Sequence, residues 1–588
     1  MEMKLRWSLV VLSVFMAIFL LGCGDDDDDS SGDPSDDDAS VDDDSADDDA
    51  DDDSADDDTW PPLPDDDTDA PDPFAIVHDF PPVAEPGEAY SYVFEAQNGV
   101  APYHGWAVVD GELPAGLSLD ASTGALTGTP LDDEETLYLF VIEAGDSSTE
   151  PQTAMETFGI RVGDPGEDGP LLKRARAYQE VYLARHNSDG LSVTADNPDD
   201  PGGDYWFSDL GDACFIHGNA SAGAAFRYAV EQSEEALDNV RLHVRGLDLL
   251  NRVNGVPGLL SRSYMPKDAP MAPNEFTQFW PINDDHEGEG EFADYYWKGD
   301  VSIDQYSGEL VGLATTWDLV PDEDVRADVR RTVEEIADHM WGNDFRIIDA
   351  DGAPTQYGDF RCFSLEGWPV PNGLTSAASL AWMRLAERVS DEPRFGEYYQ
   401  ELVTRGCPDN VQHYLWLYLG YQTKHYNVYM GFENLFVLTS LEDSPALREQ
   451  YIAGFRHLLW ESGDGLAWRR GGVEENPTFT SWYLSSTGYR DPVAVMKAIK
   501  QMDVFVDAPL RDRYIQNSAN PDIEKNPEKT DWALYPLPAN LRVPDMCIWH
   551  RSPYGLDGGD DAGRERSGHD YMLPYWMMRK LGWIGPEW

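Results

Sequence analysis

Short runs that alternate between apolar and polar residues fill the chain from residue 74 to residue 163. The runs AYSYVFEAQ and TLYLFVIEAGD have the two-residue period of half-buried strands, and Gly, Pro and Asp separate them. Turn residues recur about every ten positions, which is typical of antiparallel sandwiches. The pattern predicts a small all-β domain over residues 74–163.

After a linker at residues 163–170, apolar residues recur with the period of an α-helix. About twelve helices are expected, with aromatic-rich loops between several of them. Their predicted ranges are 171–186, 210–230, 234–253, 302–320, 322–341, 373–389, 394–405, 411–421, 429–441, 445–460, 492–506 and 568–581.

The predicted helices are of two kinds. Residues 212–228 and 307–316 are rich in Ala, Gly and other small residues, which favours burial on all sides, whereas 322–339 has a broad charged face. A solenoid of helical pairs would show a fixed sequence repeat, and none is visible. Alternating inner and outer helices predict a multidomain chain in which an all-α (α/α)6 toroid over residues 171–588 follows the β domain.

The N-terminus has the pattern of an export signal. Lys4 and Arg6 precede the apolar run 9–21, which is too short for a comfortable membrane span and ends in LLGC at Cys23. This ending resembles the bacterial lipoprotein signal. The resemblance implies cleavage of residues 1–23 before Cys23, lipidation of that cysteine, and anchoring in the bacterial cell envelope. The alternative is an ordinary signal peptide with an incidental cysteine.

Composition separates the next segment from the folded body. The 588 residues include 111 Asp and Glu against 41 Lys and Arg, which gives a net charge of −70 and argues against nucleic acid as a partner. Residues 25–72 hold 26 of the Asp residues and no basic residue. We therefore expect a disordered acidic tether over residues 24–73.

The cysteines do not indicate a zinc site. Apart from Cys23, the chain has Cys214, Cys362, Cys407 and Cys547, and none has a metal-binding spacing. One or two disulfides and buried free thiols are both compatible with this pattern. We expect no metal and no cofactor in the body of the protein.

Two stretches of the β domain resemble a known family. GELPAGLSL at 111–119 and STGALTGTP at 122–130 are similar to immunoglobulin-like repeats of bacterial surface proteins, which have a cadherin-like sandwich. The resemblance implies a spacer or adhesive module, and relatives can bind calcium. Asp110, Asp120 and Asp146 could supply oxygens for calcium, although Asp is common in turns for its local hydrogen bonds.

The helical part resembles another family through three motifs. FSDLGDA at 207–213, WKGDVSIDQYSG at 297–308 and GHDYMLPYW at 568–576 look like six-hairpin glycosidases of bacteria. The resemblance implies carbohydrate chemistry. The superfamily also includes sugar epimerases and uronate lyases, so it does not single out one reaction.

In such a ring the cleft lies over the loops that lead into the inner helices. Glycoside hydrolysis generally needs a carboxylic acid and a second carboxylate. Asp300 and Asp304 lie beside the aromatic residues 295–297, although helix capping explains such acidic residues equally well. Glu433 has the apolar neighbours Phe432 and Leu435, so it should be partly buried, which suits a general acid.

Other residues of these loops are candidates for binding a sugar by stacking or hydrogen bonding. Asp359 is a fourth candidate for catalysis, although its Gly-Asp sequence is also that of a plain turn. The catalytic candidates are thus Asp304, Glu433, Asp300 and Asp359, and the substrate-binding candidates are Trp297, Gln305, Tyr306, Arg262, His425, Asn427 and Asp570.

These features lead to one hypothesis and two alternatives. The first is a monomeric, membrane-anchored surface lipoprotein that binds and hydrolyses a polysaccharide or oligosaccharide. The second is a surface glycan-binding or adhesion protein without catalysis. The third is a polysaccharide lyase or sugar epimerase. Its reaction is compatible with four residues of the loops, His425, Tyr426, Asn427 and Arg262. Esterase, nucleotide-dependent and zinc-protease motifs are absent from the sequence.

Overall fold

The computed structural model describes residues 72–588, apart from residues 133, 200–204, 272–275, 277–283, 365–368, 413–424, 462–473, 528, 545–546 and 560–562. The predictions for the export signal, for Cys23 and for nearly all of the acidic tether lie outside these residues. Within the described part of the chain, no helix combines the length and the apolar character needed to cross a membrane.

Eight strands form the β domain. They are β1 (Ala75–Ile76), β2 (Tyr90–Val93), β3 (Ala96–Gln97), β4 (His104–Gly111), β5 (Leu117–Leu119), β6 (Ala125–Gly128), β7 (Thr136–Gly145) and β8 (Thr153–Val162). Two antiparallel three-stranded sheets, β2-β6-β5 and β4-β7-β8, enclose a core with Phe94, Trp106, Phe140 and Phe158. The predicted all-β domain is confirmed.

Glycines allow the close strand contacts of this domain. Gly116 and Gly128 have φ angles of 92° and 147°, which residues other than glycine rarely adopt. A Cβ on Gly128 would lie 2.0 Å from the backbone oxygen of Gly116. The Gly-rich motifs at residues 111–130 therefore serve strand pairing.

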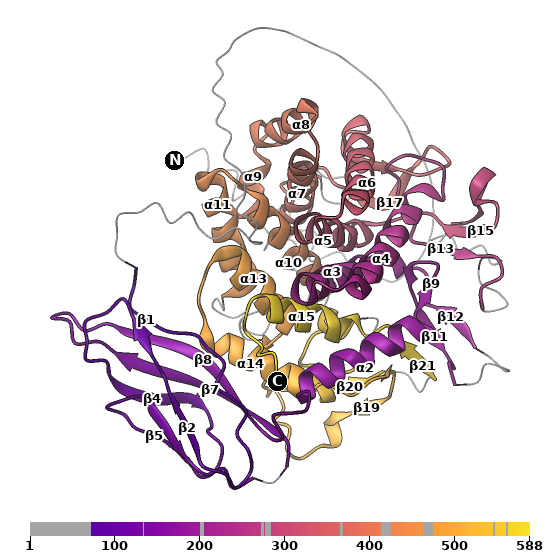
Figure 1. Cartoon of the computed structure of the whole chain (residues 1–588). Helices are drawn as coiled ribbons and strands as arrows, with labels where there is room; N and C mark the ends of the chain where they lie inside the picture. Colours follow the sequence, from indigo (N-terminus) through magenta and orange to yellow (C-terminus); the bar gives the residue numbers. More distant parts are fainter. Residues whose placement is uncertain are drawn as a thin grey trace. The chain divides into compact units, whose positions relative to one another are not determined.

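Thirteen α-helices follow in the described part of the chain (Figure 1). They are α2 (Pro170–Arg185), α3 (Ala213–Glu231), α4 (Glu234–Arg252), α5 (Ile303–Leu319), α6 (Glu323–Gly342), α7 (Gly373–Val389), α8 (Pro393–Thr404), α9 (Cys407–Val411), α10 (His425–Leu441), α11 (Pro445–Phe455), α13 (Pro477–Thr487), α14 (Pro492–Asp503) and α15 (His569–Lys580).

Six of these helices close a ring. Helices α3, α5, α7, α10, α13 and α15 contact one another in that order, and α15 contacts α3 again. Outside them, each inner helix contacts an outer partner: α4 lies on α3, α6 on α5, α8 on α7, α11 on α10, α14 on α13 and α2 on α15 (Figure 1). The predicted (α/α)6 toroid is confirmed by these contacts.

The burial of the helices explains which ones lie inside. Most of α3, α5 and α10 is buried on every side, in keeping with their small and apolar residues. By contrast, α4 and α6 bury a single face and begin with the side-chain caps Ser233 and Asp322.

The structure differs from the sequence prediction at several points. Helix α13 was not predicted, and most of the predicted helix 411–421 lies outside the described residues. The predicted helix 445–460 is split, because α11 gives way to a π-helical turn at Arg456–Trp460. Cys362 and Cys407 form a disulfide, while Cys214 and Cys547 are buried free thiols.

Small antiparallel sheets occupy most of the loops that lead into the inner helices. Their strands are β9 (Asn187–Ser188), β10 (Leu191–Ser192), β11 (Thr194–Asp196) and β12 (Trp206–Ser208) before α3; β13 (Ser263–Pro266), β14 (Asp285–Glu287) and β15 (Tyr295–Lys298) before α5; β16 (Arg346–Ile348) and β17 (Pro354–Asp359) before α7; and β18 (Leu510–Arg511), β19 (Ile515–Gln516), β20 (Asp557–Gly558) and β21 (Arg564–Arg566) before α15.

Candidate functional site

Glu433, on the inner helix α10, is a carboxyl group buried within the ring. Its side chain is fully buried, Oε1 accepts a hydrogen bond of 2.8 Å from Asn219, and Oε2 has no hydrogen-bond partner. Burial raises the pKa of Glu433 well above its usual 4.5, the Asn219 hydrogen bond lowers it, and the negative charge of Asp304 raises it further. The environment of Glu433 therefore favours its protonated form.

The partner of Glu433 has a fixed orientation. Asn219, on α3, donates through the same amide nitrogen to the oxygen of Phe215 at 3.1 Å, and its Oδ1 accepts from the Tyr429 hydroxyl at 3.1 Å. These contacts identify which end of the amide faces Glu433. Asn219 therefore acts as a donor to Glu433, and Tyr429 carries the chain of hydrogen bonds onward.

Asp304 is the carboxylate whose charge acts on Glu433. It lies in the first turn of α5, half-buried, and its Oδ1 accepts from the backbone nitrogen of Gln305 at 3.0 Å. Ser302 and Gln305 form a capping box at the same helix end. The helix N-terminus favours a negative charge at this position. The carboxylate of Asp304 on α5 thus acts electrostatically on the buried carboxyl group of Glu433 on α10.

The hydrogen-bonded chain reaches a third carboxyl group on α15. Burial, then the nearby Cys547, Glu433 and Asp570, raises the pKa of Tyr429 well above its usual value. Asp570 Oδ1 accepts from the Cys547 thiol at 2.9 Å and from the backbone nitrogen of Ile548 at 3.0 Å. We call Asp304, Glu433, Asn219, Tyr429, Cys547 and Asp570 the inner polar chain.

Asp300 and Asp359 are held in their own loops instead. Asp300 has a φ of 47°; its Oδ1 accepts from the backbone of Gln356, and its own nitrogen donates to Asp349. Asp359 forms a two-pronged ion pair with Arg361 and accepts from Ser364. These bonds outweigh burial and lower the pKa of Asp359, so it is not suited to be a general acid.

Three predicted binding residues are occupied by protein contacts. The Trp297 indole is 4% exposed and stacks on His286 at 4.1 Å, so neither it nor the fully buried Tyr306 offers an open face to a sugar. The Tyr306 hydroxyl donates to the oxygen of Gly258. Arg262 donates to the backbone oxygens of Asp300 and Gly211 and to Ser302 Oγ, which makes it a support of the loop before α5.

The remaining candidates lie at the starts of α5 and α10. Gln305 is buried, accepts from Ser302 and donates to Asp212 at 3.3 Å. His425 bonds to Glu474 at 2.8 Å and to the backbone oxygen of His550 at 3.2 Å, and Asn427 is half-buried.

The three acidic residues considered for calcium each bond to nearby backbone nitrogens. Asp110 accepts from Gly111, Asp120 from Ser122 and Thr123, and Asp146 from Val100 and Gln152. The hydrogen bonds to Asp146 lower its pKa to about 2. Their oxygens thus stabilise turns of the sandwich.

Sequence reasoning missed several members of the inner polar chain. A single Asn among the small residues of α3 was a weak signal for Asn219, because an amide in a buried helix needs a partner. Tyr429 and Cys547 carry no local signal, since their partners are more than one hundred residues away or on another element.

Comparisons with known proteins bear on the two domains separately. Residues 73–163 match the family described as "Putative Ig domain". This match covers the β domain and agrees with its two sheets. A search of curated protein sequences finds no match to the chain.

Three solved structures are broadly similar. A family 76 glycoside hydrolase from a bovine Bacteroides thetaiotaomicron strain is 10% identical, with 85% of this chain and 98% of that chain covered and a TM-score of 0.37. A family 76 α-mannanase from Bacteroides thetaiotaomicron is 10% identical, with 70% of this chain and 95% of that chain covered and a TM-score of 0.35. A polysaccharide lyase is 10% identical, with 87% of this chain and 64% of that chain covered and a TM-score of 0.34. The assignment of the toroid rests on the helix contacts described above.

Proposed function

We propose that this protein hydrolyses glycosidic bonds of a polysaccharide or oligosaccharide, with Glu433 as the acid and Asp304 as the second carboxylate. One observation carries the proposal: the fully buried Glu433, whose pKa is raised well above its usual value, lies within the electrostatic reach of the half-buried Asp304. Glycoside hydrolysis needs one carboxylic acid that donates a proton and a second carboxylate. The motifs that resemble six-hairpin glycosidases support the choice of substrate class.

The structure suggests how each carboxyl group would act. Glu433 has one oxygen without a hydrogen-bond partner, and that proton-bearing group would protonate the leaving oxygen of the scissile bond. Asp304, held at the N-terminus of α5, would act as base or nucleophile on the sugar carbon. Asn219 and Tyr429 would position Glu433 through their hydrogen bonds.

Activity of the purified full chain on a panel of glycans, measured as released reducing ends, tests this proposal. Glu433→Gln and Asp304→Asn should each lower kcat by at least about 10²-fold, because each removes a group that takes part in bond cleavage. Glu309→Gln is the matched control. Glu309 is another fully buried carboxyl group with a raised pKa on an inner helix, but it contacts Cys214 and lies outside the inner polar chain.

The outcomes separate the alternatives. Turnover that survives both Glu433→Gln and Asp304→Asn contradicts the proposal, and glycan binding without turnover in the unmodified protein identifies a binding protein. Release of unsaturated sugars would indicate a lyase. The structure does not favour that reaction, because the Arg262 donors bond to the protein and do not offer a neutralising charge for a uronate.

We also propose that Cys23 carries a lipid that anchors the chain in the bacterial cell envelope. The positively charged start, the short apolar run and the LLGC ending support this proposal. Metabolic labelling with a fatty acid should mark the unmodified protein but not Cys23→Ser, which should also leave the membrane fraction. Equal labelling of both proteins would contradict it.

A further inference from the structure

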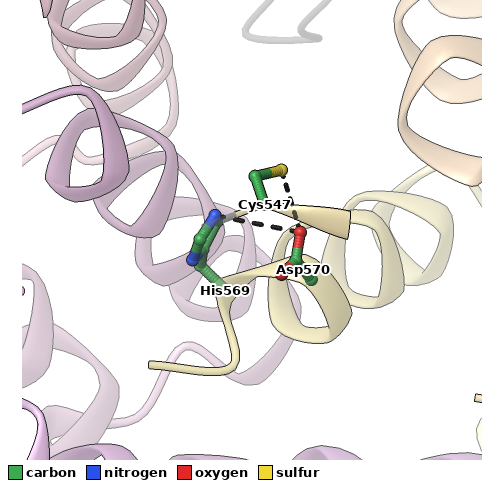
Figure 2. Close-up of side chains that lie close together, drawn as sticks. All are labelled: Cys547, His569 and Asp570. Atoms are coloured by element: carbon green, nitrogen blue, oxygen red, sulfur yellow. Dashed lines mark hydrogen bonds and ion pairs between the residues drawn. The ribbon is translucent and has the colours of Figure 1, made fainter. Parts of the chain in front are cut away.

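Cys547, His569 and Asp570 form a compact cluster at the start of α15. One donor atom from each residue lies within 4.8 Å of the others, and all three side chains are buried. Figure 2 shows the thiol and the imidazole on two sides of the Asp570 carboxylate. The cluster combines a thiol, an imidazole and a carboxyl group, the donor types that zinc binds in proteins.

Two atoms of this cluster lack partners. His569 Nε2 and Asp570 Oδ2 are buried without any hydrogen bond, and each residue is only 1% exposed. His569 Nε2 lies 3.9 Å from Asp570 Oδ1, which is too far for a hydrogen bond. Polar atoms left unsatisfied in a buried position are costly unless a further group binds there.

Hydrogen bonds on the other sides of the residues fix their orientation. His569 Nδ1 bonds to Ser567 Oγ at 3.0 Å, which leaves Nε2 as the nitrogen that faces the cluster. Asp570 is held by the backbone of Ile548 and by the Trp549 indole, which donates to its main-chain oxygen. Ligands of a metal are commonly oriented in this manner by an outer set of hydrogen bonds.

The thiol does not form a nucleophilic pair with a histidine. The Cys547 thiol donates to the Asp570 carboxylate at 2.9 Å, whereas a nucleophilic cysteine is paired with a base that takes its proton, such as an imidazole.

We propose that Cys547, His569 and Asp570 bind one Zn²⁺ ion. Zinc would displace the Cys547 proton, which leaves to solvent as a sulfur–zinc bond forms, and His569 Nε2 and an Asp570 oxygen would be the other protein ligands. Small movements suffice, because donor atoms around a tetrahedral zinc are about 3.3–3.8 Å apart. The ion would lie beside Tyr429, whose environment includes Cys547 and Asp570. This inference does not depend on the glycosidase proposal.

Metal analysis and cobalt spectroscopy of the full chain test it. The purified protein should contain close to one zinc per chain, and removal of zinc by a chelator should lower Tm reversibly. Co²⁺ added to the metal-free protein should give a thiolate-to-cobalt charge-transfer band. This band distinguishes the cluster from the acidic residues 25–72, because carboxylates give no such band.

Variants assign the signal to the cluster. Cys547→Ser should abolish the cobalt band, and His569→Gln should weaken zinc binding by at least about tenfold. Cys214→Ser removes the other buried free thiol of the described residues and should keep both the cobalt band and the zinc binding. A band that persists in Cys547→Ser or disappears in Cys214→Ser overturns the proposal. If Cys547→Ser fails to fold, the absence of a cobalt band in the unmodified chain still refutes it.

Discussion

At the scale of single residues, Glu433 links protonation to stability. Its pKa in the folded protein is raised above the value of 4.5 expected in the unfolded chain. Between the unfolded and the folded pKa, the folded chain therefore binds the proton more tightly than the unfolded chain. The contribution is fully present below pH 4.5 and is lost as pH rises through the folded pKa. We predict that the free energy of unfolding in urea decreases less from pH 5 to pH 8 for Glu433→Gln than for the unmodified protein.

Asp359 supplies a control with the opposite sign. Its pKa is lowered below 3.8 by Arg361 and Ser364, so its contribution is present above that pH and is lost as pH falls. Asp359→Asn should therefore reduce stability at pH 7 more than at pH 3. A Glu433→Gln variant that copied the Asp359→Asn profile would show that Glu433 is ionised in the folded protein.

Residue-level prediction from the sequence succeeded where neighbours along the chain hold the information. The apolar residues around Glu433 indicated its burial, which the structure confirms. The same local argument was misleading for Trp297, because aromatic residues before a helix indicate either a binding surface or a core. Trp297 stacks on His286 and so belongs to the core, and no sequence pattern indicates this pair.

At the scale of elements, α3 and α5 pack with their backbones in contact. A Cβ on Gly218 would lie 2.1 Å from the backbone oxygen of Gly308, and one on Gly312 would lie 2.7 Å from that of Gly218. Their small-residue composition, which predicted inner helices, thus has a direct packing role. We predict that Gly218→Ala destabilises the protein by at least about 1–3 kcal/mol in urea unfolding, because backbone atoms must move.

Gly342 at the end of α6 is the matched comparison. A Cβ there would meet no heavy atom within 4 Å, and its φ is not positive. Gly342→Ala should leave the free energy of unfolding unchanged or raise it by up to about 1 kcal/mol. An equal loss in both variants would mean that helix geometry rather than the α3–α5 contact sets the cost.

Helix α13 shows where element prediction fails. Its sequence PTFTSWYLSST lacks charged residues and is rich in Thr, Ser and aromatics, so it has neither an amphipathic period nor strong helix propensity. Asn476 caps its start, and nearly all of its side chains are buried in the ring. Contacts with α10, α14 and α15 stabilise this helix where its own sequence does not.

At the scale of the whole molecule, the β domain is fused to the toroid through a common core. Leu137, Leu139 and Val141 of β7 pack in the same apolar cluster as the helices, and Thr157 of β8 donates to the oxygen of Pro492. The prediction of an alternating, half-buried strand was wrong for residues 137–142, because LYLFVI is apolar throughout and β7 is buried on both faces in its middle. The β domain is therefore more than a spacer joined by a loose linker.

The C-terminal residue Trp588 completes this junction. Its ring lies so close to β8 that a Cβ on Gly159 would be 2.5 Å from it, and its backbone oxygen accepts from Leu172 at 3.1 Å. Arg161 of β8 donates to the oxygen of Glu587 at 2.7 Å. We predict that the described body unfolds in one calorimetric transition and that Trp588→Ala lowers its stability by about 3–5 kcal/mol.

Tyr535→Ala serves as the reference for this experiment, because that aromatic ring is 66% exposed and its loss should change stability by less than about 0.5 kcal/mol. If the junction couples the domains, Trp588→Ala should also separate the melting of the β domain from that of the toroid. Two transitions already present in the unmodified chain would contradict coupling, since a shared core must lose its contacts as a unit.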